Sequence, residues 1–329
     1  MVKKGLLAFV CLFFSSAVIA SFYDCRYFPL FERIMYRTPQ KPSNFLVDGF
    51  GMTGSSAYNQ HGDHKNPQGV YYSSSEFYGK YDQIKVGNAL TTVGKTNPLI
   101  SPWDTYDHIY WESHQKIQSF GLYFDWNQAL GKKWLFGLSW YVMNLSSEAK
   151  FSLSSEDEHL FPNQGDKDEI DRLRRQMNGE LLIKGEQWSN AGIGDFDIYI
   201  QRGVLKDYFL RCKKVDAGLR LGLLIPSGAK LDNDYPTSMP FGGQGHWAIY
   251  GGGNADIELK EDFTIGGLFR IIGRFAKTEN RRMSVAGELP MYGAVTGAVK
   301  IDPDFTMIVS PYVMLTDIRA GLGASLRYS

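Results

Sequence analysis

The chain has 329 residues, 43% hydrophobic and 14% aromatic, and its 35 Lys and Arg residues balance 35 Asp and Glu residues. A chain without net charge offers no overall field to a polyanion, so the composition argues against a nucleic-acid partner. Beyond the amino terminus no run of about 18 apolar residues remains, which excludes helical membrane spans, whereas strands of about 10 alternating residues can still cross a bilayer.

The amino terminus has the plan of a secretory signal. Two lysines precede an apolar core over 6–14, and small residues lead up to Ser21. This order predicts that 1–20 is a cleaved signal peptide, because the apolar core is too short for the alternative, an uncleaved anchor helix. Residues 21–43 are then expected to form a periplasmic segment.

Removal of the signal peptide discards Cys11 and leaves Cys25 and Cys212. In an oxidising compartment two cysteines can form one disulfide, and the other interpretation is two separate free thiols. The sequence leaves both open, because it does not give the distance between them.

Ten segments alternate between apolar and polar or small residues, which is the period of a β-strand. Many are ten residues or longer, whereas strands of soluble proteins commonly have five or six. The segments are 44–52, 120–128, 134–144, 194–203, 215–225, 247–259, 263–275, 291–300, 305–315 and 318–328. A hairpin hidden in 69–93 would raise the count to twelve.

The links between these segments alternate in length, if successive links fall alternately on the far and the near side of the sheet. On the near side, where the first strand begins, the expected turns are short: 131–133, 205–211, 260–262 and 302–304. On the far side the expected loops are long, except for a tight turn near Thr316: 53–116, 146–192, 226–245 and 277–290. This asymmetry is typical of outer-membrane barrels. The prediction is an all-β, transmembrane, antiparallel up-and-down β-barrel of about 10–12 strands over 44–329, with short periplasmic turns and long external loops.

Two far-side stretches invite a functional interpretation. The stretch 166–183 places Ile170, Leu173, Met177 and Leu181 at helical spacing, and Asp168 to Arg172 and Asp171 to Arg175 at i,i+4, which predicts an amphipathic helix. The stretch His61-Gly62-Asp63-His64 could bind a metal, but a polar loop is favoured. The chain contains no catalytic motif such as GxSxG or HExxH, so we expect no enzyme, and we expect no metal and no cofactor.

The aromatic residues near the strand ends are expected in the interfacial girdles of a membrane barrel, and for each one a buried core position is the alternative. They are Trp103, Trp111, Trp126, Trp134, Trp140, Tyr141 and Trp247.

Two motifs resemble parts of known barrels. Gly192-Ile193-Gly194-Asp195, followed by FDIYIQRG, is similar to the GxGD element that opens a strand in barrels related to fatty acid and aromatic-hydrocarbon uptake channels. The final strand resembles the signal read by the barrel assembly machinery, although Tyr328 is here followed by Ser329. Residues 21–43 look too short for the plug of the fatty acid channels. The resemblance implies location in the bacterial outer membrane among its lipids, contact with the assembly machinery and uptake of a small-molecule solute.

The alternation turns a charged set of mixed sign toward the lumen. In a small barrel these groups are expected to pair into a structural network rather than to form a selectivity filter. The set is Asp125, Asp195, Asp197, Asp216, Arg220, Asp256, Glu258, Arg270, Arg274, Arg319 and Arg327. The predicted function is an outer-membrane channel for passive passage of small hydrophobic solutes. The alternative is a structural or surface-interaction barrel with a closed lumen and partner-binding external loops.

Overall fold

The computed structural model describes residues 43–55, 57–58, 64–65, 80–131, 133–207, 213–283, 292–319 and 322–327. The signal peptide (1–20), residues 21–42 of the expected periplasmic segment, Cys25, Cys212 and the stretch 61–63 lie outside these residues. Predictions that concern them therefore stay predictions.

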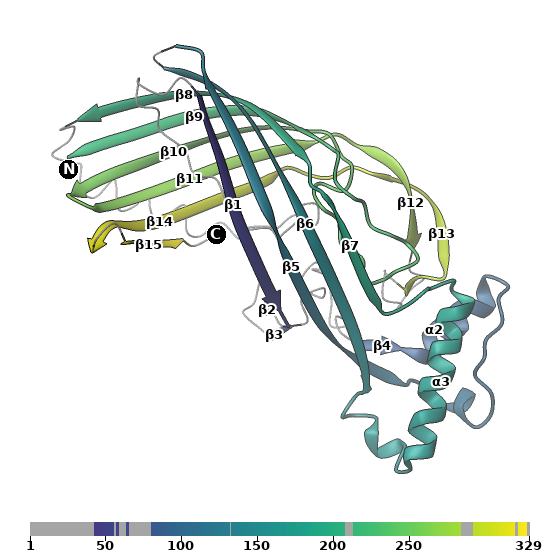
Figure 1. The fold of residues 1–329 in the computed structure, drawn as a ribbon. Coiled ribbons are helices and arrows are strands. Elements are labelled where there is room, and N and C mark those ends of the chain that lie inside the picture. The colour runs from purple at the N-terminus through teal and green to yellow at the C-terminus, as the bar shows by residue number, and fades with distance from the viewer. Residues whose placement is uncertain are drawn as a thin grey trace, which may run out of the picture.

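One antiparallel sheet dominates the described residues (Figure 1). The strands on its main path are, in spatial order, β1 (Ser43–Gly54), β5 (Tyr110–Ala129), β6 (Trp134–Leu153), β8 (Phe196–Asp207), β9 (Lys214–Ile225), β10 (Ala248–Lys260), β11 (Phe263–Arg274), β14 (Thr306–Arg319) and β15 (Leu322–Arg327). Two short strands extend it, β4 (Lys80–Asp82) on β5 and β7 (Gln187–Ile193) on β6.

The sheet curls along its path, and Figure 1 shows β5 and β6 reaching out beyond the other strands. Within the described residues its edge strands are β1, paired with β5, and β15, paired with β14. The all-β antiparallel prediction is confirmed at this level, and closure of the sheet into a barrel stays a prediction.

A second hairpin continues the main sheet without a change of register. It consists of β12 (Lys277–Met283) and β13 (Val295–Ile301). Ile272 pairs with Thr306 in β11 and β14, and Lys277 pairs with Ile301 in β12 and β13, a step of five residues along each segment (272 to 277, and 306 to 301). The two hairpins therefore form one long, bent ladder.

This ladder corrects the predicted topology around 302–304. The sequence predicts 291–300 and 305–315 as adjacent strands joined there by a near-side turn, which is wrong, because both lie on one strand line. Pro303 has no N–H and interrupts the ladder without reversing the chain. The tight turn predicted near Thr316 is also wrong, because residues 316–319 lie within β14, and the chain passes from β14 to β15 beyond Arg319, at the near end of the sheet.

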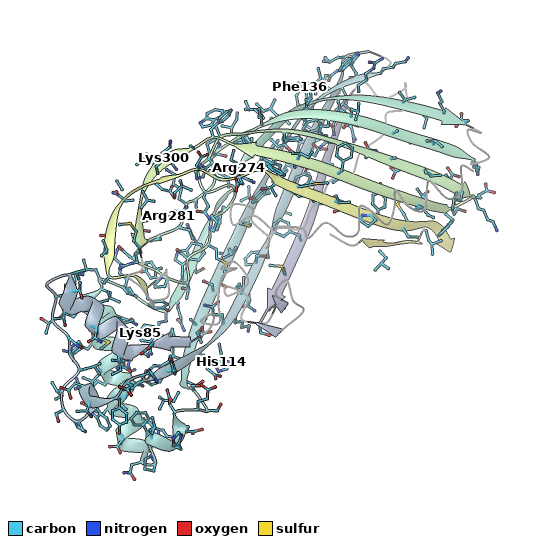
Figure 2. The ribbon with its side chains drawn as sticks, turned by 180° about the vertical axis from the view of Figure 1, so that it is seen from behind. Lys85, His114, Phe136, Arg274, Arg281 and Lys300 are labelled. Carbon is cyan, nitrogen blue, oxygen red and sulfur yellow. The ribbon has the colours of Figure 1, made fainter. Side chains whose placement is uncertain are left out.

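With this correction the two ends of the sheet differ in the lengths of the links between strands. We call the end of the sheet at which residues 130–133 link β5 to β6 the near end. The short links of the path lie there, at 130–133, 208–213, 261–262 and 320–321. The long connections lie at the opposite, far end. In Figure 2, Phe136 lies toward the near end, and Lys85 and His114 lie at the opposite extreme of the molecule.

The far-side loops contain more regular structure than expected. The predicted loops 53–116 and 146–192 are shorter, because β5 begins at Tyr110, β6 ends at Leu153 and β7 occupies Gln187–Ile193. The suggested hairpin in 69–93 is wrong for its described part, where β4 is followed by helix α2 (Gln83–Thr92). The 3-10 turns η2 (Trp103–Thr105) and η3 (Glu158–Leu160) and the two-residue strands β2 (Ala57–Tyr58) and β3 (His64–Lys65) complete the inventory.

Helix α3 (Gln164–Glu180) confirms the predicted amphipathic helix. The four apolar residues at helical spacing, from Ile170 to Leu181, are all buried. Together with α2, β4 and the far ends of β5 and β6 they form a separate hydrophobic core, which we call the helical layer. The expected pair of Asp171 with Arg175 is present at 3.1 Å, whereas Arg172 pairs with Glu169 at 2.7 Å instead of Asp168.

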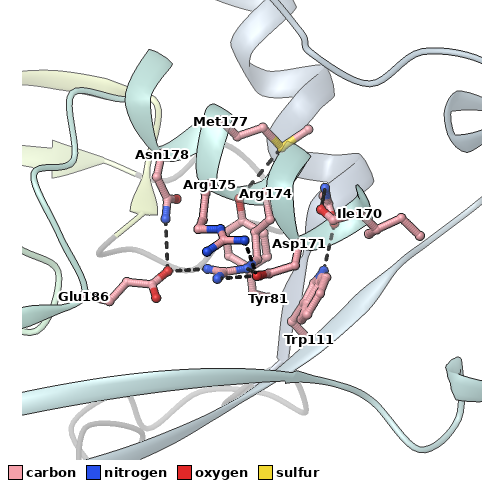
Figure 3. Close-up of polar contacts among 10 residues, drawn as sticks. Tyr81, Trp111, Ile170, Asp171, Arg174, Arg175, Met177, Asn178 and Glu186 are labelled. Atoms are coloured by element: carbon pink, nitrogen blue, oxygen red, sulfur yellow. Dashed lines mark hydrogen bonds and ion pairs between the residues drawn. The ribbon is translucent and has the colours of Figure 1, made fainter. Parts of the chain in front are cut away.

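Arg174 ties the helical layer to the sheet (Figure 3). Its guanidinium carbon lies 4.2 Å from the centre of the Phe151 ring and 5.3 Å from that of the Trp111 ring. The same group donates to Asp171 at 2.8 Å and to the Glu186 carboxylate. A buried cation between two aromatic rings and two carboxylates fixes α3 on the ends of β5 and β6.

Candidate functional site: the two faces of the sheet

The sheet has an apolar outward face. On β9, β10, β11 and β14 the outward positions alternate along each strand and share one face through the ladder pairs. None of these positions carries a charge: Val215, Ala217, Leu219, Leu221, Leu223 and Ile225; Ile249, Gly251, Gly253, Ala255, Ile257 and Leu259; Phe263, Ile265, Gly267, Phe269, Ile271 and Gly273; Met307, Val309, Pro311, Val313 and Leu315.

Many of these outward side chains are exposed, and Leu219 and Leu221 are each 66% exposed. Soluble monomers rarely expose contiguous apolar patches larger than a few hundred Å². A face of this size and composition marks a surface that an apolar phase or another chain covers.

The opposite, inner face holds the charged residues of these strands and is buried or half-buried. The acidic and basic residues expected in the lumen that have described side chains all lie on it, from Asp125 in β5 to Arg274 in β11. This arrangement, polar inside and apolar outside, is the reverse of a soluble protein and is the pattern of transmembrane barrels.

One described cluster on the inner face is centred on an ion pair. Arg270 donates to Asp197 at 3.0 Å, and its guanidinium carbon lies 3.5 Å from the centre of the Tyr250 ring. The Tyr250 hydroxyl donates to the same carboxylate at 2.8 Å. Asp197 and Arg270 are 73 positions apart in the sequence, and the ladder of β8 to β11 brings them together.

A second cluster joins β5, β8 and β9. The Tyr199 hydroxyl donates to Asp125 at 2.9 Å and also to Asn127. The guanidinium carbon of Arg220 lies 3.8 Å from the centre of the Tyr199 ring, and this group donates to Gln201 at 3.0 and 3.2 Å. These contacts agree with the interpretation of the charges as a structural network.

The two clusters share a unit that the sequence analysis missed. In each unit a tyrosine ring lies over a glycine on the neighbouring strand, where a Cβ would overlap the ring, and its hydroxyl donates to an inner-face carboxylate. The units are Gly137, Tyr199 and Asp125; Gly222, Tyr250 and Asp197; and Gly266, Tyr312 and Asp256. Glycines and tyrosines alternating on polar faces of neighbouring strands were the available signal.

Asp195 holds a long connection instead of facing a passage. Its carboxylate accepts the backbone N–H of Gly228 at 3.0 Å and that of Gly243 at 2.7 Å. The Ser227 hydroxyl donates to the carbonyl of Gly194 at 2.7 Å. These bonds draw residues 226–246, which we call the inward segment, onto the inner face. The external loop predicted at 226–245 is therefore corrected, because its backbone amides find acceptors on the sheet.

The inward segment also packs through apolar side chains. Met239 and Phe241 are buried in one cluster with inner-face residues of the sheet, among them Tyr141 and Trp188. The Tyr141 hydroxyl donates to the carbonyl of Phe241, and the hydroxyl of Ser147 to that of Thr237. This cluster covers the inner face between the polar clusters and the helical layer.

The remaining predicted residues lie toward the two ends of the sheet. Near the far end Arg274, labelled in Figure 2, donates to Thr306 at 2.7 Å. Near the near end Glu258 forms an ion pair with Lys213 at 3.3 Å. Arg319 ends β14 and Arg327 pairs with Tyr312 in the ladder, and their side chains lie outside the described ones.

The aromatic residues expected in girdles divide into two groups. On the outward face Trp134 is exposed in the first position of β6, and Trp247 is exposed beside the far end of β10. Trp126 and Trp140 are half-buried among outward aromatic neighbours. For Trp103, Trp111 and Tyr141 the girdle prediction is wrong, because they pack in the helical layer or against the inward segment.

The described residues contain no helix that is long and apolar enough to cross a membrane. They also hold no group of three or more His, Cys, Asp or Glu side chains arranged to bind a metal ion.

No protein-family model matches this chain, and no curated protein matches it either. Its function is therefore argued from its own residues.

Proposed function

We propose that this chain closes into a β-barrel in the bacterial outer membrane and passes small hydrophobic solutes through its interior. The inversion of the two faces carries the proposal: the charged side chains lie on the inner face, where Asp197 and Arg270 form an ion pair, and uncharged apolar side chains are exposed on the other face. Burial of the apolar face in lipid removes it from water, which is the dominant favourable term for such a surface.

The height of the apolar face supports a membrane wall. On β10 the outward run extends from Ile249 to Leu259, which spans about 33 Å along the strand at roughly 3.3 Å per residue. A strand tilted by about 40° covers roughly 25 Å of bilayer with this length, which is the height of the apolar band in outer-membrane barrels. β5 and β6, with 20 residues each, extend beyond such a band and lift the helical layer clear of it.

The inward segment forms the constriction of the proposed passage. It is held by two backbone N–H bonds to Asp195 and by an apolar cluster, and cooperative bonds of this kind can open and close as one unit. Its apolar side chains suit hydrophobic solutes better than hydrated ions.

The alternative is a closed structural barrel that binds a partner through its far end. The paired charges of the inner face and the well-packed helical layer favour it. The two functions differ in one measurable property, the passage of solute.

The test uses the full chain inserted into membranes, with gel mobility as the check of folding. We expect discrete current steps in planar bilayers, and faster uptake of the hydrophobic dye N-phenyl-1-naphthylamine by cells that carry the protein. Asp195→Asn weakens the clamp on the inward segment, so both the step size and the uptake should rise. Asp48→Asn removes a carboxylate from the inner-face register of β1 that forms no described hydrogen bond to the inward segment, and it should change neither. A folded protein without current and without dye uptake would overturn the transport function and favour the closed structural barrel.

A further inference from the structure

Asp216 differs from the other carboxylates of the inner face. The carboxylates of Asp125, Asp195 and Asp197 all accept hydrogen bonds. Asp216 is only 4% exposed, and within the described part of the chain neither of its carboxylate oxygens has a hydrogen-bond partner. A buried carboxylate without a partner is costly, so its presence calls for an explanation.

The neighbour of Asp216 has the same charge. Asp216 in β9 pairs in the ladder with Asp256 in β10, and the two carboxylates repel each other. Lys214, on the same face of β9, attracts Asp216 and forms no ion pair with it among the described residues. The protein therefore places two carboxylates side by side and leaves one of them uncompensated.

An aromatic side chain contacts one member of this pair, Asp256. The Tyr312 hydroxyl donates to Asp256, and its ring lies over Gly266, where any Cβ would overlap both the ring and the carboxylate. Carboxylates beside a tyrosine ring are the chemistry that binds an ammonium group, through charge and through the face of the ring. Ca²⁺ takes six to eight oxygen ligands, so a site with only two carboxylates does not favour it.

We propose that Asp216 and Asp256, with Tyr312, bind the ammonium group of a solute, so that the passage favours hydrophobic amines. This inference rests on the proposed function for its biological meaning, and the binding itself can be measured without any transport.

The test is equilibrium binding of n-butylammonium to the folded full chain in detergent micelles, followed by NMR, with 1-butanol as the neutral probe of the same length. We expect saturable binding of n-butylammonium and about tenfold weaker binding by Asp216→Asn, the loss of one charge-assisted contact. Asp216→Glu should restore binding. Asp48→Asn removes the same charge from the inner-face register of β1 and should bind like the wild type. Binding of 1-butanol should be the same in all variants.

Equal binding by folded Asp216→Asn would overturn the site, and so would a folded wild type that does not bind n-butylammonium, as expected if the two carboxylates share a proton. If the bilayers are silent and dye uptake is absent while the amine binds, the transport function fails and the site stands. If solute passes while Asp216→Asn binds n-butylammonium as well as the wild type, the ammonium site is overturned and the proposed transport function is not.

Discussion

At the scale of single residues, glycines on the inner face make room for tyrosine rings. Gly222 is the clearest case, because the Tyr250 ring lies over it and the Tyr250 hydroxyl reaches Asp197. The small residue, the aromatic ring and the carboxylate come from three neighbouring strands, so one added methyl group should disturb all three.

Gly222→Ala is therefore expected to lower the free energy of unfolding by about 1–3 kcal/mol, the usual cost of overpacking a well-packed site. Gly273→Ala is the matched control, since a Cβ there meets nothing within 4 Å. Denaturant titration of the protein in micelles measures both. Equal stability of the two variants would contradict the packing argument.

Asp82 gives the helical layer a defined pH dependence. Its carboxylate caps α2 by accepting the N–H of Ile84 at 3.1 Å, and burial raises its pKa above the ordinary value, although the caps and Lys85 act in the opposite direction. A raised pKa means that the folded state binds the proton more tightly than the unfolded chain. The contribution of protonated Asp82 to the free energy of unfolding is therefore fully present below the pKa that Asp82 has in the unfolded chain. It is lost as the pH rises through the pKa that Asp82 has in the folded state.

Asp82→Asn keeps a capping oxygen and cannot ionise. We expect the stability of the wild type to fall relative to this variant as the pH rises from about 4 toward neutrality. Hydrogen exchange of the α2 amides over that range measures the difference. A wild type that gains stability relative to Asp82→Asn as the pH rises would contradict the prediction.

At the scale of elements, α3 shows how a helix is fixed to strands by one buried cation. Arg174 touches the rings of Trp111 and Phe151 and bonds Asp171 and Glu186, so its removal leaves two carboxylates without their main partner. Arg172, two residues earlier, pairs with Glu169 on the solvent side of the same helix.

Arg174→Met should destabilise the helical layer by about 3–5 kcal/mol, the cost of breaking a buried ion pair. Arg172→Met should leave the stability of the helical layer almost unchanged, because exposed ion pairs contribute little. Limited proteolysis within α3 reports both, and the strands of the main sheet should stay protected. Similar cleavage of the two variants would show that Arg174 does not hold the layer.

At the scale of the whole molecule, the apolar outward face separates a membrane protein from a soluble sheet. Leu221 on the outward face is 66% exposed, and Leu182, just after α3, is 71% exposed. In water a lysine at either position would be tolerated, because both side chains already face outward.

In a bilayer the two positions should differ. Leu221→Lys should lower the stability of the inserted protein by about 2–4 kcal/mol, whereas Leu182→Lys, on the helical layer outside the lipid, should stay within about 0.5 kcal/mol of the wild type. Folding into lipid vesicles, followed by gel mobility against denaturant, measures both. Equal effects would mean that lipid does not cover Leu221.

The sequence by itself determined most of the long strands of the main sheet and which face of each is apolar, but it missed β7 and β12, which lie in predicted loops. A strand turns successive side chains to opposite faces, so alternation is readable without knowing the partner strand, as in 249–259. Helix α3 was readable for the same reason, since its four buried apolar residues recur at the helical period.

Only the tertiary structure decided which strands pair and where the inward segment lies. Residues 302–304 carry turn-like side chains, yet the register of β11 to β14 makes them a bend in one strand line. The inward segment is held by the backbone N–H groups of Gly228 and Gly243. Nearly every residue has such a group, so the sequence does not show which ones will bind Asp195. Pairing Asp197 with Arg270 likewise depends on strand order, because local periodicity fixes the face of a residue and long-range register fixes its neighbour.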